Sequence, residues 1–154
     1  MDKKIISISL ANPRGFCAGV DRAIEIVEQA LSKYGSPIYV RNEVVHNKFV
    51  IEALKKKGAI FVNDLKSVPE NSYLIYSAHG VSKKVKSDSD NLKLKSIDAT
   101  CPLVTKVHKE VNHYLKNNYE IIMIGHKGHP EVEGTLGQDI TSKKMHLIEN
   151  ISDI

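Results

Sequence analysis

The sequence contains no tryptophan and only two cysteines among its 154 residues. Two cysteines so far apart do not make the dense framework of a small secreted domain held by disulfide bonds. No apolar run approaches the roughly 20 residues that cross a bilayer, and residues 1–7 lack the apolar core of an export signal. We therefore expect a globular, cytoplasmic protein with no membrane association. Its cysteines are then free thiols or ligands, with a disulfide between them as the alternative.

Charge of one sign is not concentrated in any segment. The formal net charge is +4, and the lysine-rich stretches at residues 55–57, 83–86 and 143–144 are spread along the chain. The sequence has neither a basic ribbon interleaved with aromatic residues nor zinc-finger spacing, so we expect no nucleic-acid partner. A modest positive charge suits a small anionic substrate.

Short β-branched runs alternate with segments of helical periodicity. Helices are expected over residues 23–31, with Asp21 as the cap and Gly35 as the stop, over residues 48–57, and after Pro102. This alternation predicts an α/β fold with mainly parallel sheets flanked by helices. Strands are expected at residues 5–10, 38–40, 60–62, 73–76, 96–97, 121–124 and 146–148.

The composition suggests two lobes. Residues 87–91 are polar, and the strand–helix pattern restarts after them. We therefore expect a first α/β lobe over residues 1–95, which includes the first cysteine, and a second over residues 96–154. The second lobe has few strands and is expected to be incomplete.

Cys17 and Cys101 each follow a strand-like run and precede a helix-like one. A thiolate at such a junction is exposed and is favoured by the helix dipole. Gly15 and Gly19 let the backbone approach a bulky inorganic group. Two thiolates are too few for an iron–sulfur cubane or a structural zinc, which take about four ligands. The residues themselves leave open a metal or cluster ligand, a redox thiol and an inert structural cysteine.

Three histidines, His46, His79 and His129, lie in turns between expected strands and helices. There each imidazole can donate a hydrogen bond to a phosphate oxygen, next to the free amides of a helix start. In open α/β sheets ligands bind at the carboxyl ends of the strands, so these residues are candidates for one anion site. Glu131 lies just inside an expected helix start, where it either complements the dipole or donates a proton. His108, inside a helix, is expected to be a surface or packing residue.

Two common catalytic motifs are absent from the sequence. Residues 126–131 read His-Lys-Gly-His-Pro-Glu and not the His-Glu-x-x-His of a zinc protease helix. Residues 15–19 lack both the Lys-Ser/Thr of a P-loop and the full G-x-G-x-x-G spacing. Metalloprotease and nucleotide-binding functions are therefore disfavoured.

Long motifs spread over nearly the whole chain resemble one known family. With these motifs the chain resembles the LytB/IspH family of 4-hydroxy-3-methylbut-2-enyl diphosphate reductases, in its amino-terminal half only. The motifs are PRGFCAGVDRA (residues 13–23), EVVHN (43–47), SAHGVS (77–82), DATCPLVTKVH (98–108) and GHPEVEGT (128–135).

The resemblance implies a three-lobed α/β architecture around an iron–sulfur cluster of the 4Fe-4S type. Each lobe supplies one cysteine ligand, and the fourth iron is open to substrate. On that pattern Cys17 and Cys101 are two of the three ligands. The chain is then one lobe plus part of a second, a truncated or split amino-terminal part. The third lobe, with the third cysteine and the remaining substrate contacts, is absent.

The resemblance also implies roles for the other candidates. His46 and His79 would bind the diphosphate, and His129 would contact the substrate near its reacting end. Glu131 would be the proton source for loss of the allylic hydroxyl as water. The cluster carries the electron chemistry, while the protein supplies binding, orientation and protons.

The implied activity is reduction of an allylic diphosphate to isopentenyl and dimethylallyl diphosphate in the non-mevalonate pathway of isoprenoid biosynthesis. Electrons would come from a ferredoxin or flavodoxin type donor, and a complementary carboxyl-terminal polypeptide is a further expected partner. Two alternatives are kept. One is a catalytically inactive remnant that binds a partner through exposed apolar residues. The other is a thiol redox or zinc-binding protein that uses Cys17 and Cys101.

Overall fold

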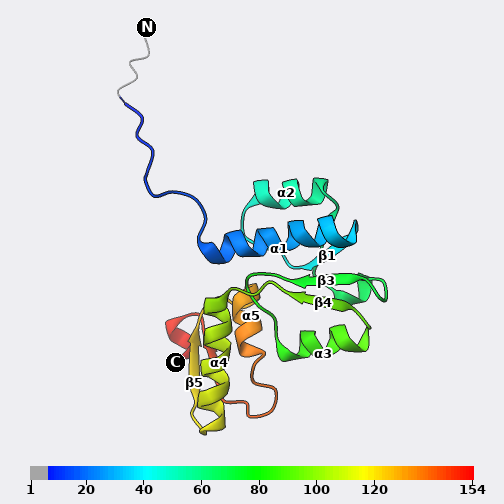
Figure 1. The fold of residues 1–154 in the computed structure, drawn as a ribbon. Helices are drawn as coiled ribbons and strands as arrows, with labels where there is room; N and C mark the ends of the chain where they lie inside the picture. Colours follow the sequence, from blue (N-terminus) through cyan, green and yellow to red (C-terminus); the bar gives the residue numbers. More distant parts are fainter. Residues whose placement is uncertain (1–6) are drawn as a thin grey trace.

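The computed structural model describes residues 7–154. Its main sheet has four parallel strands in the order β2-β1-β3-β4 (Figure 1). Because the strands are parallel, all their carboxyl ends lie at one edge of the sheet. The strands are β1 (Ile38–Arg41), β2 (Ala59–Val62), β3 (Tyr73–Tyr76) and β4 (Lys95–Asp98).

Helices cover both faces of this sheet. Helices α1 (Ala18–Tyr34) and α2 (Lys48–Lys56) lie on one face, and α3 (Lys83–Asn91) lies on the other (Figure 1). Because successive side chains of a strand point to opposite faces of the sheet, the buried side chains form two clusters, one on each face. Ile75 packs in the cluster that contains α1 and α2, whereas Leu74 belongs to the opposite cluster. Strands that bury both faces are typical of parallel sheets.

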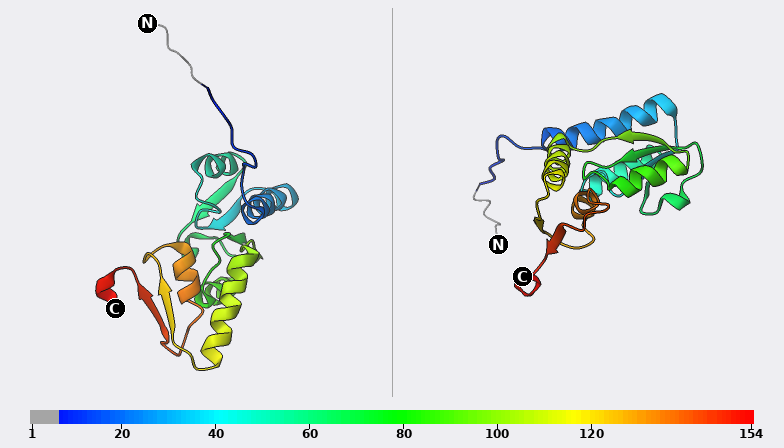
Figure 2. Two further views of the ribbon diagram at one scale, coloured as in Figure 1. Left: turned by 90° about the vertical axis from the view of Figure 1, so that its left-hand side faces the viewer. Right: turned by 90° about the horizontal axis from the view of Figure 1, so that it is seen from below.

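A second, smaller unit follows β4. Its sheet has two parallel strands, β5 (Ile121–Ile124) and β6 (Met145–Ile148). With helices α4 (Pro102–Lys116) and α5 (Pro130–Leu136) it forms a body beside the main sheet (Figure 2). Pro102 and Pro130 stand at the first helical positions, where the missing amide costs nothing. Short 3-10 helices span Leu65–Ser67 and Ile151–Asp153.

The two units are joined through α5. A Cβ on Gly134 would lie 3.2 Å from the carbonyl oxygen of Gly80, so only a hydrogen at residue 134 allows this close approach. The buried Gln138 side chain donates to the carbonyls of Val81, at 3.1 Å, and Gly134, at 2.7 Å. The Lys83 amide donates to the Gly137 carbonyl at 3.1 Å. These contacts set the carboxyl-terminal half of α5 against the loop after β3 and the start of α3.

The predicted fold class is confirmed. Six of the expected strands occur within a residue or two of their expected bounds, and the helices expected from residue 48 and after Pro102 are present. The expected strand at 5–10 lies partly outside the described residues, and residues 7–10 form no strand. Within residues 7–154 no helix is both long and apolar enough to cross a membrane.

One local prediction is wrong, and one helix was not predicted. Helix α1 begins at Ala18 with Cys17 as its cap, not after Asp21, because the amides of Val20 and Asp21 donate to the Cys17 carbonyl. Polar residues 87–91 belong to α3, which the sequence pattern did not indicate. Ser89 is buried there and donates to the Val85 carbonyl at 2.8 Å, which satisfies its hydroxyl inside the helix.

The division into lobes at residues 95 and 96 stays a prediction. The first sheet includes the whole of β4, whose register with β3 runs from Lys95 to Asp98. Helix α4 then begins the smaller unit.

Leu74→Ala is expected to lower the free energy of unfolding by about 2–4 kcal/mol, because a fully buried side chain leaves a cavity in the core. Urea unfolding followed by circular dichroism measures this loss. Ile122→Ala is the control: its side chain is 63% exposed, and we expect a change within about 0.5 kcal/mol. Equal losses would contradict the assignment of the core.

Candidate functional site

The predicted site residues converge at the carboxyl edge of the main sheet. His46 follows β1, His79 comes three residues after β3, and Cys101 comes three residues after β4. His129 follows β5 of the smaller unit, and Cys17 directly precedes α1. This is the edge at which parallel sheets bind ligands.

Three imidazole rings meet there. The ring centroids of His46 and His79 are 4.4 Å apart, those of His46 and His129 are 5.2 Å apart, and those of His79 and His129 are 5.8 Å apart. His46 is exposed, while His79 and His129 are half-buried. Three ring N–H donors so close together suit an anion with several oxygens.

Main-chain hydrogen bonds hold the histidine loops in place. The Ala78 amide, next to His79, donates to the Val44 carbonyl at 3.4 Å, and the Cys101 amide donates to the Ala78 carbonyl at 3.0 Å. Beyond His46, Asn47 caps α2 by accepting a hydrogen bond from the Val50 amide. The loops after β1, β3 and β4 are thus bonded to one another in the order of their strands.

His129 is the cap residue of α5. Its Nδ1 accepts a hydrogen bond from the Glu131 amide at 3.3 Å, which leaves Nε2 to carry the proton in the neutral ring. Glu131 itself is exposed in the first turn of the helix. Glu133, two residues further along, accepts a hydrogen bond from the Gly128 amide at 3.0 Å. Glu131 is therefore the carboxylate of this turn without a hydrogen-bond partner among residues 7–154.

His79 is the most perturbed group of the site. Burial, together with the neighbouring His46 and His129, lowers the pKa of His79 to about 4, and Glu43 opposes the shift. Its Nε2 is buried and has no hydrogen-bond partner within residues 7–154. A buried polar atom without a partner costs free energy, and a bound ligand that accepts from it would remove that cost.

The two cysteines are free thiols whose sulfurs both lie near Gly19. A Cβ on Gly19 would lie 2.7 Å from the Cys101 sulfur and 3.8 Å from the Cys17 sulfur. Cys17 caps α1 and Cys101 caps α4, so each stands at the positive end of a helix dipole. Neither side chain forms a capping hydrogen bond.

This arrangement fits two ligands of a metal group. Both sulfurs point toward the space above a glycine, where any larger side chain would collide with one of them. Residues 7–154 contain no group of three or more histidine, cysteine or acidic side chains that could hold a metal ion. Two thiols from this chain would therefore need further ligands from elsewhere.

Two residues near the site were not predicted to belong to it. His108 lies against the loop after β3: its Cε1 would be 2.9 Å from a Cβ on Gly80. Burial lowers the pKa of His108, Lys86 adds to this and Asp98 opposes it. The hydroxyl of the fully buried Ser77 has no partner within residues 7–154. The only sequence signal for His108 is its spacing of seven from Cys101, which puts both at one side of a helix.

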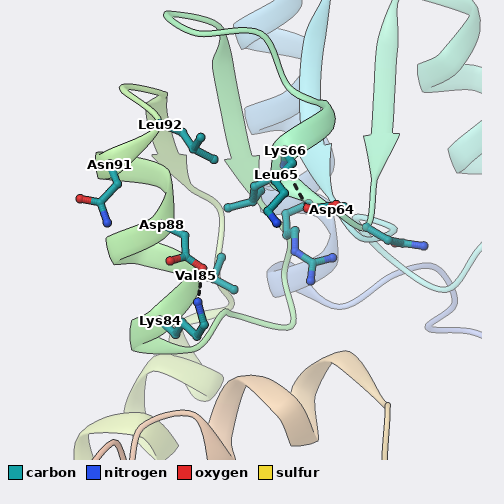
Figure 3. Close-up of a pocket in the computed structure, with 10 residues that line it drawn as sticks. Asp64, Leu65, Lys66, Lys84, Val85, Asp88, Asn91 and Leu92 are labelled. Carbon is teal, nitrogen blue, oxygen red and sulfur yellow. Dashed lines mark hydrogen bonds and ion pairs between the residues drawn. The ribbon is translucent and has the colours of Figure 1, made fainter.

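A cavity of about 330 Å³ lies elsewhere, between α3 and the residues after β1 and β2 (Figure 3). None of the predicted site residues lines it. Its Lys84 and Asp88 pair with each other at 2.7 Å, and Asp64 accepts from the Lys66 amide at 3.0 Å. Because these charged side chains already pair with each other or with the main chain, the cavity is a weaker candidate for a ligand site than the histidine cluster.

Comparison with known proteins identifies the family. Residues 8–154 match the family model described as LytB protein. The chain belongs to the LytB family. Among curated LytB relatives, the 4-hydroxy-3-methylbut-2-enyl diphosphate reductase of Nitrosomonas europaea is 64% identical over 151 residues, which cover 97% of this chain and 47% of that protein. The reductase of Vesicomyosocius okutanii is 62% identical over 149 residues, which cover 97% of this chain and 48% of that protein.

Solved LytB structures agree. The reductase from Plasmodium falciparum superposes with a TM-score of 0.87 at 51% identity, covering 92% of this chain and 44% of that one. A second solved structure, of (E)-4-hydroxy-3-methyl-but-2-enyl diphosphate reductase, gives a TM-score of 0.79 at 32% identity, covering 95% and 52%. The chain thus spans about half the length of the curated relatives it matches.

The low pKa of His79 predicts a pH dependence of stability. In the unfolded chain a histidine has a pKa of about 6.5. As the pH falls from 6.5 toward 4, the unfolded state binds a proton at His79 that the folded state does not. The free energy of unfolding therefore falls over this window, and His79→Asn removes that part of the fall.

The measurement is urea unfolding of both proteins at pH 7 and pH 5. Allowing for the partial exposure of the ring, we expect the loss between these pH values to be about 1 kcal/mol smaller in His79→Asn. An unchanged pH dependence would contradict the low pKa.

Proposed function

We propose that this chain is the part of a 4-hydroxy-3-methylbut-2-enyl diphosphate reductase that binds the diphosphate and supplies two cysteine ligands to a 4Fe-4S cluster. The observation that carries the proposal is the meeting of three imidazoles, one of which, His79, lies on a loop that is hydrogen-bonded to the segment of Cys101. The relatives named above as such reductases support it.

In the proposed reaction the allylic diphosphate takes up two electrons and two protons. Its carbon–oxygen bond to the hydroxyl breaks, water leaves, and isopentenyl or dimethylallyl diphosphate remains. A ferredoxin or flavodoxin type donor supplies the electrons. The cluster, when bound, supplies the electron-transfer chemistry, and the protein supplies binding, orientation and protons.

The histidines hold the diphosphate. The unpartnered Nε2 of His79 donates to one phosphate oxygen. The exposed His46, whose ring centroid is 4.4 Å from that of His79, binds the same phosphate group. His129, with Nε2 free to donate, lies on the side of the smaller unit and contacts the substrate nearer its reacting end. A diphosphate next to His79 raises the pKa of that imidazole, so binding takes up a proton.

Glu131 is the proposed proton source. It is two residues from His129, exposed, and without a hydrogen-bond partner within residues 7–154, so that its carboxyl group can approach the departing hydroxyl. A general acid must first lie within hydrogen-bond distance of the group that it protonates, and only then does its pKa decide its efficiency.

Cys17 and Cys101 are the two proposed cluster ligands. These 154 residues contain no third cysteine, so in this proposal the remaining ligand comes from outside them, in the same chain or in a complementary carboxyl-terminal polypeptide. In this proposal residues 1–95 and 96–154 are the first lobe and part of the second, and the protein acts in the cytoplasm. Leu103, 73% exposed beside Cys101, and Phe16, 48% exposed beside Cys17, offer apolar area for that polypeptide.

The same exposed apolar side chains favour a second candidate, a piece that binds a partner without catalysing a reaction. The two thiols near Gly19 favour a third, a thiol redox or zinc-binding protein. Iron and acid-labile sulfide in anaerobically purified protein would favour the reductase. Stoichiometric zinc would favour the third candidate.

Inorganic pyrophosphate tests the diphosphate site without any cluster. We expect His46→Ala and His79→Ala each to weaken binding about tenfold, because each removes a hydrogen bond to a charged group. Binding is expected to strengthen from pH 8 to pH 6, with proton uptake. Isothermal titration calorimetry in buffers of different ionisation enthalpy measures both.

His146→Ala is the matched control for this titration. His146 lies on β6 and pairs with Glu120 at 2.6 Å, away from the three rings. Equal weakening in His146→Ala would mean that pyrophosphate binds through general positive charge, and would refute the site.

Gly19→Ala tests the cluster site. The added Cβ would lie 2.7 Å from the Cys101 sulfur, so we expect less than about a tenth of the iron and sulfide bound after anaerobic reconstitution. Reconstitution uses the chain together with the carboxyl-terminal half of the Nitrosomonas europaea relative, and turnover is assayed with a reduced viologen dye. Urea unfolding of the iron-free Gly19→Ala chain checks that the variant is folded.

Glu131→Gln is the complementary variant. It is expected to bind iron, sulfide and pyrophosphate as the unsubstituted chain does and to lose turnover by about 100-fold or more, since it cannot donate the proton. Full iron loading in Gly19→Ala would contradict the proposed cluster site. Full turnover in Glu131→Gln would contradict Glu131 as the proton source.

A further inference from the structure

Arg22 connects the two segments that carry the cysteines. It lies in the second turn of α1, five residues after Cys17. Its Nη1 donates a hydrogen bond to the carbonyl oxygen of Thr100 at 3.0 Å. Thr100 directly precedes Cys101, so this single contact bridges the start of one helix and the loop before another.

Other contacts hold each segment separately. The Cys101 amide donates to the Ala78 carbonyl at 3.0 Å, which ties its loop to the sheet. The amide of Thr100 donates to the Asp98 carboxylate at 2.9 Å, which shapes the turn. On the other side, residues 7–16 before Cys17 have no helix or strand and are exposed. The start of α1 also packs against this region, since Ala23 and Val20 belong to the same apolar cluster as Ala99. Among residues 7–154, Arg22 makes the one hydrogen bond between α1 and residues 98–101.

We propose that Arg22 is a positioning residue that sets the separation of the Cys17 and Cys101 sulfurs. A guanidinium group suits this role because it is long enough to reach a main-chain carbonyl from a helix and is always protonated. Without the contact the amino-terminal turn of α1 moves relative to residues 98–101, and the sulfurs no longer both lie near Gly19. The inference rests on the proposed function only in that both thiols serve one bound group.

Disulfide trapping in the reduced, metal-free chain measures the separation directly. Both sulfurs lie within 4 Å of one point above Gly19, so rotation of the side chains can bring them together. Diamide, an azo oxidant, accepts the two electrons and two protons of the thiols as the Sγ–Sγ bond forms. The rate of the intrachain bond is followed by peptide mass spectrometry at high dilution. No iron and no substrate are present, so failure here is distinct from failure of the proposed function.

We expect Arg22→Ala to slow the cross-link about five- to tenfold, which corresponds to the loss of one hydrogen bond from a charged donor. Arg22→Lys, which keeps the charge and most of the length, should recover at least half of the rate. Arg14→Ala is the matched control. Arg14 bonds only to the nearby Ala11 carbonyl, at 3.3 Å, among residues 7–154, and its removal should leave the rate unchanged.

Two further measurements separate positioning from other effects. Alkylation of each thiol by iodoacetamide should proceed at the same rate in Arg22→Ala as in the unsubstituted chain, since positioning does not change the reactivity of a single thiol. Urea unfolding should also show that Arg22→Ala is fully folded under the conditions of the cross-linking assay. An unchanged cross-linking rate, equally slowed alkylation, or no cross-link in the unsubstituted chain would each overturn the proposal.

Discussion

The main-chain pairing between the loops after β3 and β4 is the constraint on which the site depends. The Ala99 amide donates to the Tyr76 carbonyl at 3.1 Å, and the Cys101 amide donates to the Ala78 carbonyl at 3.0 Å. The ladder of the parallel sheet thus continues beyond its strands. Because His79 and Cys101 stand at the ends of these paired segments, the imidazole and the thiol are placed by hydrogen bonds that continue those of the sheet.

Two glycines allow the smaller unit to pack closely against the loop after β3. Gly80 has a φ of +73°, a conformation that side chains with a Cβ rarely adopt, and it leaves room for His108 beneath it. Gly134 lets α5 approach the same loop to within contact of the Gly80 carbonyl. His129 caps α5, so its distance from His79 follows from how closely two main chains can pack. The cluster of His46, His79 and His129 is consequently shared between the two units.

Much of the fold was predictable because its strands are short, β-branched and bounded by turns. The expected strands at 73–76 and 121–124 have the observed bounds. The convergence of His46, His79 and His129 followed from a general property of parallel sheets, and the family from the motifs around them. Helix α3 was not predictable, since its polar sequence carries little periodicity and its stability comes from packing of residues such as Val85 against the sheet.

The sequence by itself determined the α/β class, the loops that hold the reactive residues and the membership of the LytB family, because these depend on local pattern and on long motifs. Only the tertiary structure decided that the two sulfurs both lie near Gly19, that the imidazoles lie 4.4 to 5.8 Å apart, and that burial depresses the pKa of His79. Distances and burial depend on how segments far apart in the chain pack together. Arg22 shows this most simply: its partner lies 78 residues away.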